Sequence, residues 1–124
     1  MSLFKNCNVF YYHVSNWEAA KKFYDDVLEW PVAYSSEEMG WREYGRDNET
    51  HVAINLWDAS RGPRPEGHNG ICTFTVDDVT ATTAALRAKG VKCDDPMVIP
   101  GIVALGTFYD PEGNRFQFAS SLTQ

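Results

Sequence analysis

Three histidines are the strongest potential metal ligands and proton carriers in this 124-residue sequence: His13, His51 and His68. Three converging imidazoles would form a zinc-type site. His13 lies near the end of an expected strand, His51 beside a turn and His68 in a loop, so we favour separate structural roles for them. No nucleophile motif occurs, and His13, with Tyr11 nearby, is the one candidate for a general base.

A second set of residues suits ligand binding better than catalysis. Aromatic side chains could stack on a planar ligand, and amide and hydroxyl groups could orient its polar edge. The alternative is that the same side chains fill a closed barrel that has no cavity. The candidate ligand-binding residues are Tyr11, His13, Trp41, Asn55, Trp57, Thr73, Tyr109 and Gln117.

The elements that must position these residues follow one order in the first half of the chain. A strand over 8–14 precedes a helix over Trp17–Leu28, which Ser15 or Asn16 can cap and which ends before Pro31. Strand-like stretches follow at about 31–36, 39–45 and 50–57. Residues 58–69, rich in Pro and Gly, indicate a linker.

The same order recurs in the second half. A strand over 71–76 precedes a helix over Val79–Lys89, which Asp77 or Asp78 can cap and which Gly90 ends. Further strands are expected near 91–98, 103–109 and 114–120. Asp-Pro-Glu-Gly-Asn at 110–114 has the composition of a turn between the last two.

A constant spacing links the two halves. Val76 lies 62 positions after Val14, and the same spacing joins the cap positions, the helix ends and, by this interpretation, Asn55 to Gln117. We therefore predict an α+β fold of two βαβββ modules, at about 4–57 and 70–120, that form a paired, curled mixed sheet. Residues 1–124 would make a single domain; chance coincidence of two βα units is the alternative.

The motifs and their order resemble the vicinal oxygen chelate superfamily, which includes glyoxalase I, bleomycin-resistance proteins and extradiol dioxygenases. Phe-Tyr-x-x-x-Leu at 23–28 and Asp-Pro-Glu-Gly-Asn at 110–114 carry the resemblance, which covers about residues 4–120. It implies two modules that enclose a ligand cleft, a divalent metal in many members, and a homodimer.

The resemblance also implies where metal ligands would lie, on the first and last strands of each module. In this sequence those positions hold Val9, Asn55, Ile71 and Gln117. Two aliphatic side chains and two neutral amides make a poor site for a transition metal. We therefore expect no metal and no other cofactor.

Strand alternation predicts which side chains face that cleft. Alternate residues of a strand point to opposite faces, so Tyr11, His13, Asn55 and Trp57 should lie on the face opposite the helix. Trp41 and Tyr44 have opposite parity, and Trp41 is the one expected on this face. The predicted face contains no carboxylate.

Two functions compete for these observations. The favoured one is a small-molecule-binding protein of the glyoxalase/bleomycin-resistance type, which lacks the usual metal ligands and binds an aromatic or amphipathic compound in the cleft. The alternative is a lyase, isomerase or dioxygenase that uses relocated metal ligands or His13 as a base. A third is an accessory subunit with a filled cleft.

Composition narrows the partners and the location. The net charge of -6, with scattered basic residues, argues against nucleic-acid binding. No apolar run approaches the length of a membrane span, and the first residues do not resemble a signal peptide. Cys7, Cys72 and Cys93 form neither an even framework nor a CxxC pair, so a reduced, cytoplasmic protein is expected.

Overall fold

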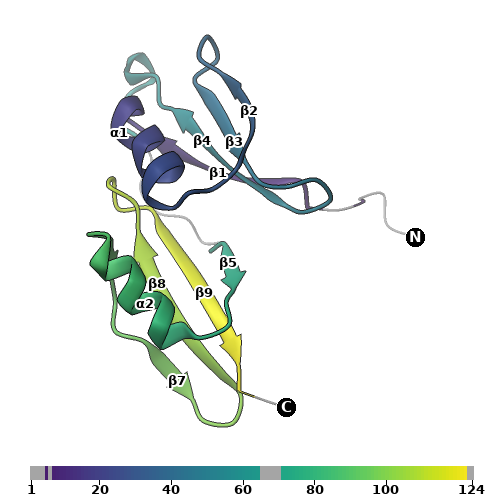
Figure 1. Ribbon diagram of the computed structural model, residues 1–124. Helices are drawn as coiled ribbons and strands as arrows, with labels where there is room; N and C mark the ends of the chain where they lie inside the picture. Colours follow the sequence, from purple (N-terminus) through teal and green to yellow (C-terminus); the bar gives the residue numbers. More distant parts are fainter. Residues whose placement is uncertain (1–4, 6, 65–70, 123–124) are drawn as a thin grey trace. The chain divides into compact units, whose positions relative to one another are not determined.

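The chain folds into two compact units, Met1–Glu66 and Gly67–Gln124, each built on its own mixed β-sheet (Figure 1). A computed structural model describes residue 5 and residues 7–64 and 71–122. The α+β class with two mixed sheets is confirmed. A single domain with modules at 4–57 and 70–120 stays a prediction, and part of the expected linker, including His68, lies outside the described residues.

The first unit has a four-stranded sheet in the order β1-β4-β3-β2. The pair β1–β4 is parallel, and the other pairs are antiparallel. The helical segments pack on one face of this sheet, so the other face is left for the candidate residues. The elements are β1 (Val9–Val14), α1 (Trp17–Lys22), η1 (Phe23–Val27), β2 (Val32–Ser36), β3 (Trp41–Tyr44), β4 (His51–Leu56) and η2 (Ala59–Arg61).

The first helix begins as expected but changes its winding after six residues. The side chain of Asn16, not Ser15, caps α1 by accepting from the Ala19 N–H at 3.1 Å. From Phe23 onward the chain forms a π-helical turn, in which Leu28 N–H donates to Phe23 O at 3.0 Å. The prediction of one α-helix over Trp17–Leu28 was therefore wrong in its second half, because periodicity alone does not distinguish the wider turn.

The second unit repeats the order with one additional short strand. Its sheet runs β5-β9-β8-β6, with β7 also paired to β8, and β5–β9 is its parallel pair. The stretch expected as one strand over 91–98 is divided into β6 and β7. The elements are β5 (Thr73–Thr75), α2 (Val79–Ala88), β6 (Lys92–Cys93), β7 (Met97–Ile99), β8 (Val103–Tyr109) and β9 (Arg115–Ser121).

The constant spacing of 62 does not extend to the last strands. In β1–β4, Tyr11 pairs with Ala53, a separation of 53 − 11 = 42 positions, whereas in β5–β9 Thr73 pairs with Gln117, a separation of 117 − 73 = 44. If the first strands align at 62, the last strands align at 64. Gln117 therefore corresponds to Ala53 and not to Asn55, because the second unit has two more residues between its paired strands.

Each unit has a core between its sheet and its helix. Phe118 is 2% exposed, and Gly106 opposite it has no room for a side chain, since a Cβ there would lie 2.2 Å from the Phe118 ring. Phe10, on the face of β1 opposite Tyr11, is 38% exposed. The buried residues of the first unit include Tyr12, Val14, Phe23, Tyr24, Tyr44, Val52 and Ile54, and those of the second include Val79, Val91, Phe108, Phe116 and Phe118.

The turn at 110–114 forms as its composition predicts. The buried Asp110 carboxylate accepts from the backbone N–H groups of Glu112 and Asn114, at 2.9 and 2.8 Å, and from the Asn114 side-chain amide at 2.7 Å. Gly113 has a φ of 84°, a conformation that favours glycine. These local bonds hold β8 and β9 in register.

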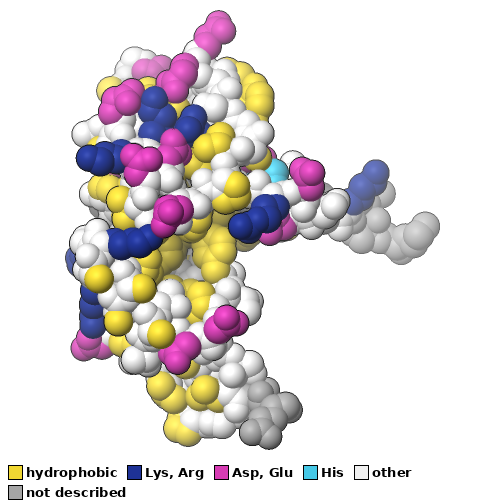
Figure 2. Space-filling model, in the orientation of Figure 1, with side chains coloured by type: hydrophobic (Ala, Val, Ile, Leu, Met, Phe, Trp, Pro, Cys, Tyr) yellow, Lys and Arg dark blue, Asp and Glu magenta, His cyan; other side chains and the backbone are white. Residues whose placement is uncertain are grey.

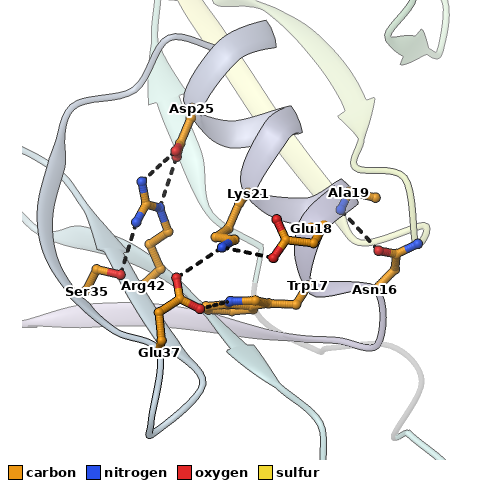
Figure 3. A network of polar contacts seen from close by, with 9 residues as sticks. All are labelled: Asn16, Trp17, Glu18, Ala19, Lys21, Asp25, Ser35, Glu37 and Arg42. Carbon is orange, nitrogen blue, oxygen red and sulfur yellow. Dashed lines mark hydrogen bonds and ion pairs between the residues drawn. The ribbon is translucent and has the colours of Figure 1, made fainter.

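Polar side chains join α1 and η1 to the hairpin formed by β2 and β3 (Figure 3). The Glu37 carboxylate accepts from Trp17 Nε1 at 2.6 Å and from Lys21 Nζ at 3.0 Å. Arg42 donates through Nε and Nη2 to the Asp25 carboxylate, at 3.1 and 2.5 Å. In Figure 2, charged side chains of both signs gather over α1, which identifies this side as a solvated structural face.

Candidate functional site

The register of the first sheet brings most of the predicted residues to one face. Tyr11 pairs with Ala53, and Asn55 pairs with both His13 and Trp41, so these side chains share the face that the helices leave open. Trp57 follows β4 and continues its pairing, with its N–H bonded to Val14 O at 2.8 Å. We call the side chains of Tyr11, His13, Trp41, Asn55 and Trp57 the aromatic face.

Ring contacts run across the aromatic face without interruption. Tyr11 lies 5.2 Å from Trp41 and 5.6 Å from His13, centroid to centroid, and His13 lies 4.8 Å from Trp57. These distances fall within the range of favourable aromatic pairs. Tyr11 is 49% exposed. The face therefore exposes ring surface to solvent. Beneath the rings, Ala53 is fully buried.

His13 and Asn55 form a hydrogen-bonded pair in the middle of this face. Asn55 Nδ2 donates to Gly40 O at 3.1 Å, which assigns the orientation of the amide and leaves Oδ1 toward His13 Nδ1, 3.1 Å away. A carbonyl oxygen can only accept, so Nδ1 must carry a proton. In neutral His13 the basic nitrogen is consequently Nε2.

Two arginines stand at the Trp57 end of the face. The Arg61 guanidinium lies 4.7 Å from the Trp57 ring centroid, and Trp57 Nε1 donates to Gly62 O at 2.8 Å. Arg64 Nη1 donates to His13 O at 3.3 Å. The residues after β4 thus hold Trp57 in place and give this end of the face a positive character, which the sequence did not reveal.

The opposite end holds a carboxylate, contrary to expectation. Glu43 pairs with Ala53 in β3–β4 and therefore shares the aromatic face. Its Oε1 accepts from Trp41 Nε1 at 3.2 Å, and its Oε2 contacts His51 Nδ1. Glu43 lies two residues after Trp41, so strand alternation alone would have placed its side chain on the same face.

His51 contacts an acceptor at each ring nitrogen. Besides Glu43, the Arg46 main-chain carbonyl lies 2.8 Å from Nε2. The bond to Glu43, then the bond to Arg46 O, raise the pKa of His51 above its usual value. His13 and His51 share a face, but each has its own partners, so they do not converge on one ion.

In the second unit the predicted residues form two separate contacts. Thr73 Oγ1 donates to Gln117 Oε1 at 3.1 Å on paired strands. Tyr109 lies on the same face of the sheet, two residues beyond Thr107, which pairs with Gln117. Its hydroxyl donates to Asp94 Oδ2 at 2.8 Å, and this bond raises the pKa of Tyr109. Both predicted amides, Asn55 and Gln117, have the polar partners that their partial burial requires.

The observed register changes one of the four positions at which the resemblance implies metal ligands. With the observed register, these positions are Val9, Ala53, Ile71 and Gln117. Only Gln117 carries an oxygen donor, and one neutral amide is insufficient for a transition metal. Elsewhere in residues 7–64 and 71–122, no three His, Cys, Asp or Glu side chains gather as a metal-binding group.

Two further observations concern the cysteines and the possibility of a membrane-spanning helix. Cys7, Cys72 and Cys93 form no disulfide among the described residues, and burial raises the pKa of the Cys93 thiol. Among the described residues, no helix is both long and apolar enough to cross a membrane. The fold and the aromatic face together define an α+β protein of two sheet-and-helix units.

The chain belongs to the Glyoxalase/Bleomycin resistance protein/Dioxygenase superfamily, whose family model matches residues 8–118. This confirms the resemblance. No curated protein matches the chain.

Solved structures support the same fold. TnmS3, an antibiotic-binding protein from Streptomyces sp. CB03234, is 23% identical with a TM-score of 0.78, and the match covers 98% of this chain and 99% of that one. A superfamily member from Sphaerobacter thermophilus DSM 20745 is 23% identical, with a TM-score of 0.78 and coverage of 97% and 100%. A lactoylglutathione lyase from Agrobacterium tumefaciens is 16% identical, with a TM-score of 0.71 and coverage of 98% and 97%. At these identities the likeness establishes fold alone.

Proposed function

We propose that this protein binds a planar aromatic or amphipathic small molecule on the aromatic face and does so without a metal. The observation that carries the proposal is the row of ring contacts from Trp41 through Tyr11 and His13 to Trp57, with Tyr11 49% exposed. Aromatic surface flanked by a few oriented polar groups suits such a ligand. TnmS3, described as an antibiotic-binding protein, shows that this fold can serve binding.

The polar groups of the face suggest how the ligand would be oriented. His13 and Asn55 would meet its polar edge, and the Arg61 end would favour an acidic substituent, since that guanidinium lies over Trp57. Thr73, Tyr109 and Gln117 of the second unit stay part of the proposal, to be tested by their own variants. We extend the proposal to a homodimer in the cytoplasm, and sedimentation of the purified protein would test the dimer.

A thermal-shift screen of planar aromatic compounds, followed by calorimetric titration of the hits, tests this function. Tyr11→Ala should weaken binding about fivefold, because an aromatic contact contributes about 1 kcal/mol. Phe10→Ala is a matched control, since Phe10 neighbours Tyr11 on β1 but points to the opposite face and is 38% exposed. Equal effects of the two substitutions, or no stabilising compound in a broad library, would contradict the proposal.

A metal-free enzyme is the second candidate, and the His13–Asn55 pair favours it. Because Asn55 Oδ1 accepts from Nδ1, neutral His13 would present a basic Nε2, as a general base requires. Elemental analysis and turnover assays separate the candidates. Turnover that is lost in His13→Ala while ligand binding persists would favour this enzyme, whereas about one equivalent of metal per chain would favour relocated metal ligands instead.

A further inference from the structure

Glu43 joins two side chains that lie on either side of it. One carboxylate oxygen accepts from the Trp41 indole N–H at 3.2 Å, and the other contacts His51 Nδ1. Glu43 and His51 are mostly shielded, with side chains 20% and 18% exposed. The three side chains form a continuous hydrogen-bonded chain that ends at the Arg46 carbonyl, 2.8 Å from His51 Nε2.

The chemistry of these contacts favours one charge state of His51. Its ring nitrogens face a carboxylate and a carbonyl, both of which only accept hydrogen bonds. The imidazolium can donate to both, whereas the neutral ring has one N–H and must lose one of the two bonds. Neutral His51 would therefore keep its hydrogen bond either to the Glu43 carboxylate or to the Arg46 carbonyl, but not both.

The carboxylates on the two segments beside His51 both favour its protonated form. β3 contributes Glu43, and the turn before β4 contributes Glu49, whose carboxylate accepts from the Arg46 N–H at 2.6 Å. Both carboxylates raise the pKa of His51. β1 places Val9, which is apolar, opposite His51.

We propose that Glu43 is a positioning residue for ligand binding, which protonated His51 holds so that its other oxygen fixes the Trp41 indole on the aromatic face. One consequence rests on the proposed function: the ligand affinity should fall as His51 loses its proton. The orientation of Trp41 itself is independent of any ligand.

The chain contains a matched comparison on the opposite side of the same sheet. Trp17 also donates its indole N–H to a glutamate, Glu37, at 2.6 Å (Figure 3). There the second carboxylate oxygen is held by Lys21 instead of a histidine. Lys21 has a raised pKa and Glu37 a lowered one, so neither titrates near neutral pH. Trp17 should therefore not respond where Trp41 does.

Nuclear magnetic resonance of the full chain tests the positioning. Between about pH 5 and pH 9, the Trp41 indole N–H resonance should shift with the titration of the His51 ring, and that of Trp17 should not. Glu43→Gln and His51→Gln should abolish the shift, and Glu49→Gln should preserve it. A Trp41 resonance that ignores His51, or that still titrates in His51→Gln, would overturn the inference.

Binding of anilinonaphthalene sulfonate, a planar aromatic probe, tests the consequence. Its affinity for the wild-type chain should fall about fivefold as the pH rises through the His51 titration, the scale of one aromatic contact. In His51→Gln this fall in affinity should be absent. A constant wild-type affinity would overturn the role of Glu43 in binding. Absence of binding at every pH would contradict the proposed function, while the Trp41 resonance still decides the positioning.

Discussion

Asn55 is bonded through both ends of its amide, to His13 at 3.1 Å and to Gly40 O at 3.1 Å. It thereby links β1, β4 and the turn before β3. Among single residues of the aromatic face, it is the one whose bonds determine a neighbour's proton position. Both hydrogen-bond partners of the Asn55 amide, His13 and Gly40, belong to the first unit.

Replacement of Asn55 should affect both stability and His13. Asn55→Ala removes two hydrogen bonds of about 1 kcal/mol each, so the free energy of unfolding should fall by about 2 kcal/mol. The His13 ring should lose its preference for a protonated Nδ1, which nitrogen chemical shifts measure. Thr73→Ala removes a hydroxyl of the second unit, which contacts Gln117 Oε1 at 3.1 Å and Ile71 O at 3.5 Å, and serves as a control. Unchanged His13 shifts in Asn55→Ala would disprove the assigned tautomer.

At the scale of elements, helix caps and turns carry local stability. Asp78 accepts from the Ala81 N–H at 2.9 Å and caps α2, one of the two cap positions that the sequence offered. The neighbouring Asp77 is exposed and precedes the helix. The helix therefore depends on one of two adjacent carboxylates.

Asp78→Ala should lower the free energy of unfolding by about 1 kcal/mol, the usual contribution of an N-cap side chain. Urea unfolding followed by circular dichroism measures it. Asp77→Ala should change the same quantity much less. Equal losses for the two variants would mean that the cap does not act through its side-chain bond.

The β3–β4 turn should make stability depend on pH through His51. The pKa of His51 in the folded chain is raised above its usual value of 6.5, chiefly by the bond to Glu43, so folding takes up protons in the intervening range. The stabilisation is complete below that value and is lost as pH rises through the folded pKa. His51→Gln should remove this part of the pH dependence, which urea midpoints at several pH values measure. An identical profile in both proteins would contradict it.

For the whole molecule, the register of the two sheets decides which residues of the two units correspond to each other. Val9, Ala53, Ile71 and Gln117 include one neutral oxygen donor, and the corrected position of Ala53 removes the second amide. The positions at which the resemblance implies metal ligands thus hold mainly aliphatic side chains. Binding on the aromatic face would not need an ion.

Chelation should therefore leave the protein unaffected. We expect the melting temperature to stay the same after dialysis against a chelator and after addition of zinc, nickel or manganese, because binding to the folded state alone would raise it. Differential scanning calorimetry measures this. A reproducible increase with one ion, lost in His13→Ala or His51→Ala, would show that relocated ligands exist.

Much of the fold could be predicted because it depends on neighbours in sequence. The strand around Tyr11, the caps at Asn16 and Asp78, and the 110–114 turn each follow from residues a few positions apart. Strand parity also placed Tyr11, His13, Asn55 and Trp57 on one face, and the register of β1 and β4 confirms it.

Other features depend on pairing between distant strands. Parity gives the face of a side chain but not which residue lies opposite, since register is set by hydrogen bonds across the sheet and by the lengths of the connections. For that reason the sequence alone determined two βα repeats and an aromatic face. Only the tertiary structure decided that Gln117 matches Ala53, that η1 winds as a π-helix, and that Glu43 meets both Trp41 and His51.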